Sequence, residues 1–199
     1  MTFASRLGSW LFRQRTWLPL PLVAALLLIP PPSDAQGASL WITGAMFVAV
    51  GEAIRLWAVH HIGAISRTRS DRLGPLVSSG PFALIRNPLY VGNIFLWAGF
   101  ALCAQLVWFA PIAVALLALE YHAIVRWEEG LLTERMGEPY AQYVARVPRW
   151  LPSLSSWPGP PAPSAPAVTF SWRQTLFSER GTLIAIGAGF VLLWLKARF

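Results

Sequence analysis

Two polar segments stand out in a chain that is otherwise rich in apolar residues. The first, residues 73–92, reads LGPLVSSGPFALIRNPLYVG and holds two Gly-Pro pairs and Asn87-Pro88. Proline and glycine interrupt helices and leave backbone N–H and C=O groups without partners. At a membrane interface these groups need other partners, and a bound polar ligand is one way to supply them. An ordinary connecting loop is similarly rich in glycine and proline. This segment alone therefore fits both a ligand-binding site and a simple loop.

The second polar segment, residues 126–152, has an acidic pair, Glu128 and Glu129, where a long apolar run ends. Apolar and aromatic residues then recur at helical spacing, interrupted by Gly137 and Pro139. The recurring residues are Leu131, Leu132, Met136, Tyr140 and Tyr143. This pattern predicts an amphipathic helix, a turn and a second short helix on the surface of a bilayer. Such helices either anchor a membrane protein or cover a site, and the pattern fits both roles.

The elements that must position these segments are membrane helices. Of the 199 residues, 55% are hydrophobic and 13% are charged, and the mean hydropathy is +0.50. A soluble domain usually carries about 25% charged residues, and a disordered chain is poor in apolar residues. The composition therefore excludes both classes. The fold class it predicts is all-α, a polytopic helical bundle in a membrane.

Five apolar runs give the expected membrane helices. They cover about Trp17–Pro30, Leu40–His60, two spans within Leu89–Val125, and Gly181–Leu195. Leu89–Val125 is too long for one span of about 20 residues, and Gln105 and Pro111 indicate a tight hairpin near its middle. The first run could instead be a signal peptide, with Ser33-Asp34-Ala35 as a loose cleavage site. The last run could instead lie along the interface.

Arginine residues orient these helices. The N-terminal tail, the loop after the second run and the segment after the fourth run are rich in Arg, whereas residues 31–39 and the hairpin tip hold none. The positive-inside rule therefore places the N-terminus and both polar segments in the cytoplasm. Only Lys196 and Arg198 fall on the opposite side. This topology accounts for the net charge of +7 better than nucleic-acid binding does.

The chain is expected to have four parts. These are an N-terminal tail with the first helix (1–37), a core (38–152), a Pro-rich linker (153–169) and a C-terminal appendage with a possible fifth helix (170–199). Small residues let membrane helices approach closely. A homodimer contact through Gly181, Gly187 and Gly189 is therefore one possible use of the appendage.

Glu52 and Arg55 lie three residues apart inside the second apolar run, where they can pair on one helix face. Charged groups at that depth are costly unless they are paired. The pair either locks two helices together or lines a polar cavity. The one cysteine, Cys103, and the three histidines do not suggest a metal site.

Taken together, the two polar segments resemble the paired motifs of one family. Leu76-Val77-Ser78-Ser79-Gly80 and Arg86-Asn87-Pro88-Leu89-Tyr90-Val91-Gly92 resemble a Leu-Val-x-x-Gly run followed by Arg-His-Pro-x-Tyr-x-Gly. Glu128-Glu129, the run Gly137-Glu138-Pro139-Tyr140-Ala141-Gln142-Tyr143, and Arg146-Val147-Pro148 resemble the partner motif. The family is that of isoprenylcysteine carboxyl methyltransferase and the related membrane phospholipid methyltransferases. The resemblance covers about residues 50–152.

This resemblance implies a helical membrane bundle with S-adenosylmethionine as cofactor at its cytoplasmic face, and a lipophilic methyl acceptor that enters from the bilayer. Carried over by position, the cofactor-binding residues are Gly74, Pro75, Leu76, Val77, Phe82, Asn87, Pro88, Leu89, Tyr90 and Glu128. Arg126 and Glu129 are the expected catalytic residues, and Glu129 and Tyr140 are second-tier candidates for the cofactor-binding shell. A carboxylate such as Glu128 suits the ammonium or the ribose hydroxyls of that cofactor. The faces of Tyr90 and Phe82 suit its adenine or its sulfonium.

The chain departs from the family pattern at three positions. Asn87 and Gly74 stand where the family usually has His, and Phe82 stands where it has Tyr. In the carboxyl methyltransferases an Arg one turn before the acidic pair handles the substrate carboxylate, and the matching residue here is Ile124. The resemblance thus leaves the acceptor open among a prenylcysteine-like carboxylate, a phospholipid amine and an isoprenoid.

Two other functions stay open at this point. One is an NADPH-dependent membrane reductase of the sterol-reductase type, whose similar Arg-His-Pro motif continues with Asn-Tyr where Leu89 stands. The other is a catalytically degenerate membrane scaffold, which the three replaced polar side chains suggest.

Overall fold

A computed structural model describes residues 3–32, 37–63, 76–153 and 170–198, with side chains from residue 6 onward. Every element within these ranges is a helix. In chain order they are α1 (Phe3–Gln14), α2 (Leu20–Leu28), α3 (Gly37–Ile62), the 3-10 helix η2 (Gly80–Ala83), α4 (Pro88–Cys103), α5 (Phe109–Met136), α6 (Glu138–Arg146) and α7 (Trp172–Lys196). The predicted Gly74 and Pro75, the possible cleavage site Ser33–Ala35 and nearly all of the Pro-rich linker lie outside the described residues.

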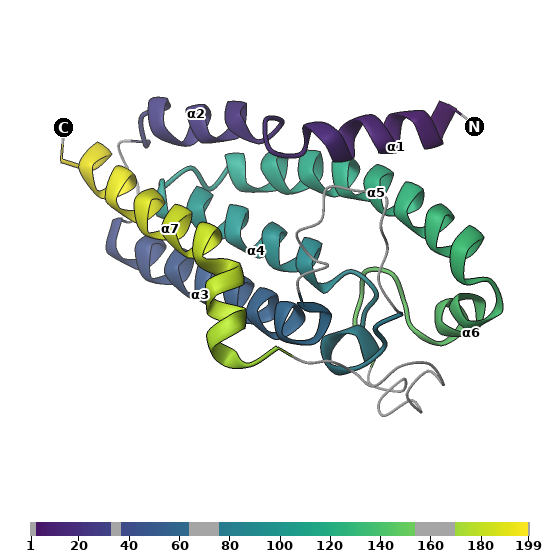
Figure 1. The fold of residues 1–199 in the computed structure, drawn as a ribbon. Helices are drawn as coiled ribbons and strands as arrows, with labels where there is room; N and C mark the ends of the chain where they lie inside the picture. The colour runs from purple at the N-terminus through teal and green to yellow at the C-terminus, as the bar shows by residue number, and fades with distance from the viewer. Residues whose placement is uncertain (1–2, 33–36, 64–75, 154–169, 199) are drawn as a thin grey trace.

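The helices form one elongated bundle (Figure 1). Helices α3, α4 and α5 lie side by side, α1 and α2 follow the outer side of α5, and α7 crosses α3 and α4. Helix α3 ends, α4 begins and α5 leads into α6 at the same end of the bundle, which we call the α6 end. The described parts of both polar segments therefore lie at one end of the molecule.

In the part of the chain that the structure describes, three helices, α3, α5 and α7, are long and apolar enough to cross a membrane, and α4 is a shorter apolar helix. The first apolar run differs from the prediction, because a turn over residues 15–19 separates α1 from α2. Helix α2 has 9 residues, which rise about 14 Å, whereas the hydrocarbon core is about 30 Å thick. Helix α2 therefore crosses only part of the membrane, and α1 continues along α5. The all-α membrane bundle is confirmed for the described residues, with three helices long enough to cross and α4 as a shorter apolar helix.

The predicted hairpin is confirmed at Gln105, whose φ of 61° lies in the left-handed region between α4 and α5. Helix α7 begins well before the predicted start at Gly181. A capping box at Ser171 explains the difference, since the Gln174 N–H donates to Ser171 Oγ at 3.3 Å and the Ser171 N–H donates to Gln174 Oε1 at 2.8 Å. The polar first turns of α7 are thus helical as well.

Helices α3 and α4 approach closely through paired glycines. A Cβ atom on Gly44 would lie 2.6 Å from the Gly99 carbonyl oxygen, and one on Gly51 would lie 2.7 Å from that of Gly92. Only residues without a side chain permit this contact, which places α3 alongside the first turns of α4. Gly189 packs against Phe100 within the chain, and homodimerisation through α7 stays a prediction.

Candidate functional site

The two polar segments meet through Tyr90 and Glu128. Helix α4 begins at Pro88, whose fixed φ suits the first helical position, and this start places Tyr90 on the first turn. The Tyr90 hydroxyl donates a hydrogen bond to Glu128 Oε2 of α5 at 3.0 Å. The Tyr90 ring also lies 4.8 Å from the ring of Tyr121. The predicted residues Tyr90 and Glu128, one from each motif, thus share one location.

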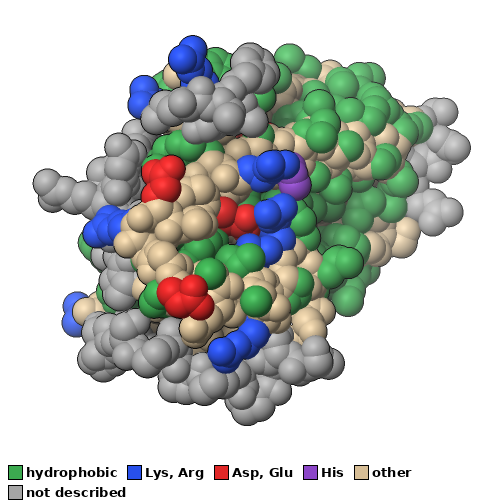
Figure 2. Space-filling model, turned by 90° about the vertical axis from the view of Figure 1, so that its right-hand side faces the viewer, with side chains coloured by type: hydrophobic (Ala, Val, Ile, Leu, Met, Phe, Trp, Pro, Cys, Tyr) green, Lys and Arg blue, Asp and Glu red, His purple; other side chains and the backbone are tan. Residues whose placement is uncertain are grey.

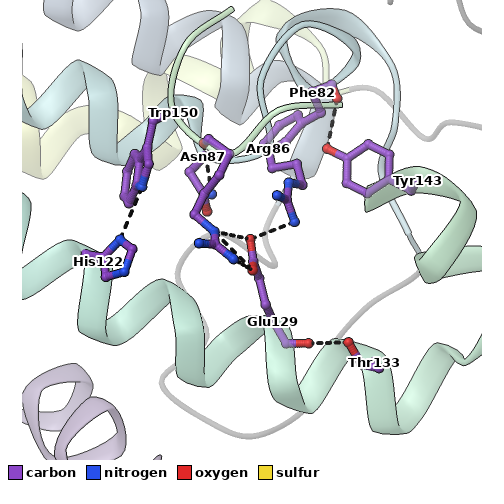
Figure 3. Close-up of polar contacts among 9 residues, drawn as sticks. Phe82, Arg86, Asn87, His122, Glu129, Thr133, Tyr143 and Trp150 are labelled. Carbon is purple, nitrogen blue, oxygen red and sulfur yellow. Dashed lines mark hydrogen bonds and ion pairs between the residues drawn. The ribbon is translucent and has the colours of Figure 1, made fainter. Parts of the chain in front are cut away.

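The neighbouring Glu129 holds two guanidinium groups (Figure 3). Arg149 Nη2 lies 2.6 Å from Glu129 Oε2, and Arg149 Nε donates to Oε1 at 3.1 Å. Arg86 Nη1 lies 2.9 Å from Oε1. The hydrogen bonds to Glu129 raise the pKa of Arg149 above its ordinary value. Glu129 therefore joins α5 to the segment before α4 and to the segment after α6.

The segment after α6 folds back along the first motif. The backbone N–H of Arg86 donates to the Pro148 carbonyl at 2.9 Å, and that of Ser153 donates to the Leu84 carbonyl at 3.1 Å. The side-chain amide of Asn87 donates to the Arg149 carbonyl at 3.2 Å. Pro148 and the positions after it thus hold the Arg-Asn-Pro turn in place, although sequence reasoning assigned no role to the later positions.

Helix α6 covers the 3-10 helix η2. The buried Tyr143 hydroxyl donates to the Phe82 carbonyl at 2.8 Å, and the Arg86 guanidinium donates to the Tyr140 hydroxyl. Burial raises the pKa of Tyr140 to about 12, with a further rise from the negative charge of Glu129. Burial also raises the pKa of Tyr143 well above its usual value. Both phenols therefore stay protonated near neutral pH.

The loop before η2 needs glycine at position 80. Gly80 has φ of 59°, and a Cβ atom there would collide with the imidazole of His61 at the end of α3. Inside the same turn, the buried Ser79 hydroxyl finds no hydrogen-bond partner among the described residues. A polar ligand bound at this turn would have one donor and acceptor available.

The other predicted site residues fall into three groups. Phe82 and Pro88 are buried, and Leu76, Val77 and Leu89 are half-buried at the α6 end. Leu76 packs against the buried cluster of Tyr140, Tyr143 and Val147. Arg126 is exposed on α5, about 200° around the helix from Glu128. The structure thus gathers most of the predicted cofactor-binding residues but leaves Arg126 apart.

Arg86 and Arg149 are the side chains that sequence reasoning missed. Arg86 was part of the recognised motif but received no role, and Arg149 follows the Arg-Val-Pro run. In Figure 2, which looks onto the α6 end, Lys and Arg side chains border an acidic group near the centre of the face, and apolar side chains cover one flank. Within the described ranges, no group of three or more His, Cys, Asp or Glu side chains is placed to hold a metal ion.

Comparisons with known proteins agree on a family. The sequence model of the phospholipid methyltransferase family matches residues 40–138. The human protein-S-isoprenylcysteine O-methyltransferase is 33% identical over 132 residues, which are 62% of this chain and 45% of that enzyme. No solved structure matches the chain significantly.

Two bacterial relatives carry names that refer to metal resistance. The nickel-cobalt-cadmium resistance protein NccN of Alcaligenes xylosoxydans xylosoxydans is 29% identical over 157 residues, which are 76% of this chain and 70% of the relative. The cobalt-zinc-cadmium resistance protein CzcN of Cupriavidus metallidurans is 30% identical over 116 residues, which are 58% of this chain and 50% of the relative. The chain thus spans half or less of CzcN and of the human enzyme.

The apolar helices and these comparisons identify an integral membrane protein. Residues 40–138 include both the Tyr90–Glu128 contact and the ion pairs of Glu129 with Arg86. By this match and by its likeness to the isoprenylcysteine methyltransferases, the chain belongs to the phospholipid methyltransferase family of membrane methyltransferases.

Proposed function

We propose that this protein transfers a methyl group from S-adenosylmethionine to a lipophilic acceptor that reaches the α6 end from the bilayer. The contact between Tyr90 and Glu128 is the observation that carries the proposal, because it joins the two motifs at one place. The methyltransferase relatives support the reaction class. They do not favour the NADPH-dependent reductase considered above.

Glu128 is the group that we assign to the cationic part of the cofactor or to its ribose hydroxyls. Its carboxylate accepts from Tyr90 at the seam between α4 and α5, and the positive charge of Arg15 acts on it without forming an ion pair within the described residues. A carboxylate in such surroundings binds a cation or a hydroxyl donor strongly because few competing partners are present. The Ser79 hydroxyl, which has no hydrogen-bond partner among the described residues, and the polar backbone groups of the half-buried residues 76–80 offer further polar contacts.

S-adenosylmethionine supplies an electrophilic methyl group when it is bound, and methyl transfer depends chiefly on positioning. This chain's residues then have to orient the donor, exclude water and admit the acceptor. We assign to Glu129 the role of holding the segment 147–150 over Asn87 through Arg149. Arg126, which is exposed on α5, is a candidate for contact with the headgroup of the acceptor.

The acceptor is a prenylcysteine-like carboxylate, a phospholipid amine or an isoprenoid. Ile124, which stands where the carboxyl methyltransferases have an Arg, is fully buried against Phe12 and Tyr121. This position offers no charge to a substrate carboxylate. We further propose that the α6 end faces the cytoplasm, because the described arginines of the second segment lie there.

The first test is calorimetry of the detergent-purified protein with S-adenosylmethionine and with its demethylated product. We expect the wild type to bind, and Glu128→Gln to weaken binding by about tenfold or more, equal to about 1.4 kcal/mol. Glu134→Gln is the matched control, because Glu134 is exposed on the same helix. Absence of binding at millimolar cofactor, or an equal loss in both variants, contradicts the proposal. NADPH in the same assay discriminates the reductase.

The second test is a methylation assay on lipid extracts with a radiolabelled methyl donor. Mass spectrometry of the labelled product identifies the acceptor class. Cofactor binding without turnover on any extract would favour the degenerate scaffold over the enzyme.

A further inference from the structure

A buried polar junction connects α7 to α3 and α4. Arg55 of α3 lies with Nη2 at 2.7 Å from Glu179 Oε2 of α7, and its Nη1 donates to Asn93 Oδ1 of α4 at 2.6 Å. Arg55 Nη2 also donates to Thr182 Oγ1 of α7 at 3.2 Å. The side chains of Arg55 and Glu179 are 13% and 2% exposed. Charges at such depth persist only when they are well paired.

The sequence predicted a different partner for Arg55. The predicted pair with Glu52 exists, but Arg55 Nε lies 3.6 Å from Glu52 Oε2, which is longer than its contact with Glu179. Glu179 comes from the C-terminal appendage, which lies beyond the residues that match the family. A residue outside the matched region therefore balances a charge inside it.

From this junction a series of contacts leads to Glu128. Asn93, which accepts from Arg55, also shares a hydrogen bond with the side chain of Tyr121. The ring of Tyr121 packs at 4.8 Å against that of Tyr90, and the Tyr90 hydroxyl donates to Glu128. Asn93 lies three residues after Tyr90, so both are on one face of α4.

Helix α7 is also fastened to the end of α3. The backbone N–H of Phe170 donates to the His60 carbonyl at 2.8 Å, and the rings of His60 and Trp172 stack at 4.4 Å. At its other end α7 is held by Lys196, whose Nζ donates to the Leu26 carbonyl at 2.6 Å. Lys196 lies at the end of the bundle away from α6, so the two ends of α7 can be loosened separately.

We propose that α7 contributes to the methyl-transfer site and that Glu179 is a positioning residue for the contact between Tyr90 and Glu128. Glu179 holds Arg55 against Asn93, and Asn93 with Tyr121 keeps Tyr90 in the orientation that holds Glu128. When the charge of Glu179 is lost, Arg55 turns toward Glu52 on its own helix and releases Asn93. This inference rests on the proposed function, because it concerns the residue assigned to S-adenosylmethionine.

The test compares Glu179→Gln with Lys196→Met, each of which loosens one end of α7. The first measurement needs no ligand and is hydrogen exchange of the purified protein. We expect Glu179→Gln to speed backbone exchange over residues 88–93 and 121–128, and Lys196→Met to leave these segments unchanged. Equal effects of both variants, or no effect of Glu179→Gln, overturn the inference whether or not the protein binds S-adenosylmethionine.

The second measurement is the affinity for S-adenosylmethionine in a double-mutant cycle. We expect Glu179→Gln to weaken binding about fivefold in the wild-type background and less than twofold in Tyr90→Phe, because the hydroxyl that transmits the effect is then absent. Equal losses in the two backgrounds would mean a general structural role and overturn the inference. If the wild type itself does not bind, the proposed function fails, while hydrogen exchange still decides this inference.

A second variant guards against misfolding of Glu179→Gln. Arg55→Lys keeps the buried positive charge, but a single ammonium replaces the fork that reaches both Asn93 and Glu179. We expect it to weaken binding and speed exchange in the same segments. Unchanged affinity and exchange in Arg55→Lys contradict the inference.

Discussion

Glu128 faces the seam between α4 and α5, whereas Glu129 faces the segment that follows α6. The first carboxylate accepts a hydrogen bond from the Tyr90 hydroxyl. The second is paired with the guanidinium groups of Arg86 and Arg149. Successive residues of a helix point about 100° apart, so two adjacent identical side chains enter two different environments.

This difference in partners suggests different roles for the two glutamates, ligand binding for Glu128 and support of the fold for Glu129. Two positive charges surround Glu129, so its charge is used within the fold, where it joins three segments of the chain. Glu128 accepts from a neutral donor, and the positive charge of Arg15 acts on it without forming an ion pair within the described residues, so we assign this carboxylate to a cationic ligand. We therefore propose that the acidic pair consists of one ligand-facing residue, Glu128, and one structural residue, Glu129. Three predictions test that division.

The largest expected effect is on stability in Glu129→Ala. This change leaves two partly buried guanidinium groups near each other without a carboxylate, and we expect a loss of about 3 kcal/mol. Glu128→Gln is the comparison, because the amide oxygen still accepts from Tyr90 and no ion pair is broken. Denaturant unfolding in detergent measures both. Similar losses in the two variants would remove the distinction between the residues.

A smaller effect is expected for Tyr143→Phe in α6. The change leaves the buried Phe82 carbonyl without its 2.8 Å hydrogen bond, at a cost of about 2 kcal/mol. Thermal unfolding tests this, with Gln142→Ala on the exposed side of α6 as control. If α6 only lies on the bilayer and does not hold η2, the two variants will unfold alike.

The smallest effect, counted per pH unit, concerns alkaline pH. The pKa of Tyr140 in the folded protein is about 12, above the value of about 10 expected for the unfolded chain. The folded state therefore keeps a proton that the unfolded state loses. The contribution of Tyr140 to the free energy of unfolding is fully present below about pH 10, and it falls by about 1.4 kcal/mol per pH unit toward pH 12. Tyr140→Phe should reduce that slope, and an unchanged slope would show that Tyr140 is not buried beside Glu129.

The sequence was sufficient for much of the architecture. The apolar runs predicted membrane helices, Gln105 marked the hairpin, and the paired motifs identified Tyr90 and Glu128, which the structure brings together. These features depend on local composition and on short spacings. The beginning of α7 was missed because the capping residues Ser171 and Gln174 are polar and precede the apolar run.

The ion pairs between residues far apart in the chain could not be predicted from composition or short spacings. Arg55 and Glu179 are separated by 124 positions and Arg149 and Glu129 by 20, and neither spacing belongs to a helix repeat. Glu52, which shares a helix with Arg55, was the obvious local partner, yet the closer carboxylate comes from α7. The close approach of α3 and α4 through Gly44, Gly51, Gly92 and Gly99 likewise depends on how two helices face each other.

The sequence by itself determined that the chain is a helical membrane protein, because apolar length and charge content fix which segments can leave water. It also determined which residues carry the family motifs. Only the tertiary structure decided which of two adjacent glutamates pairs with arginine and which meets Tyr90, and which carboxylate balances Arg55. Those pairings depend on how the helices rotate and pack around one another, so they cannot be predicted from spacing along the chain.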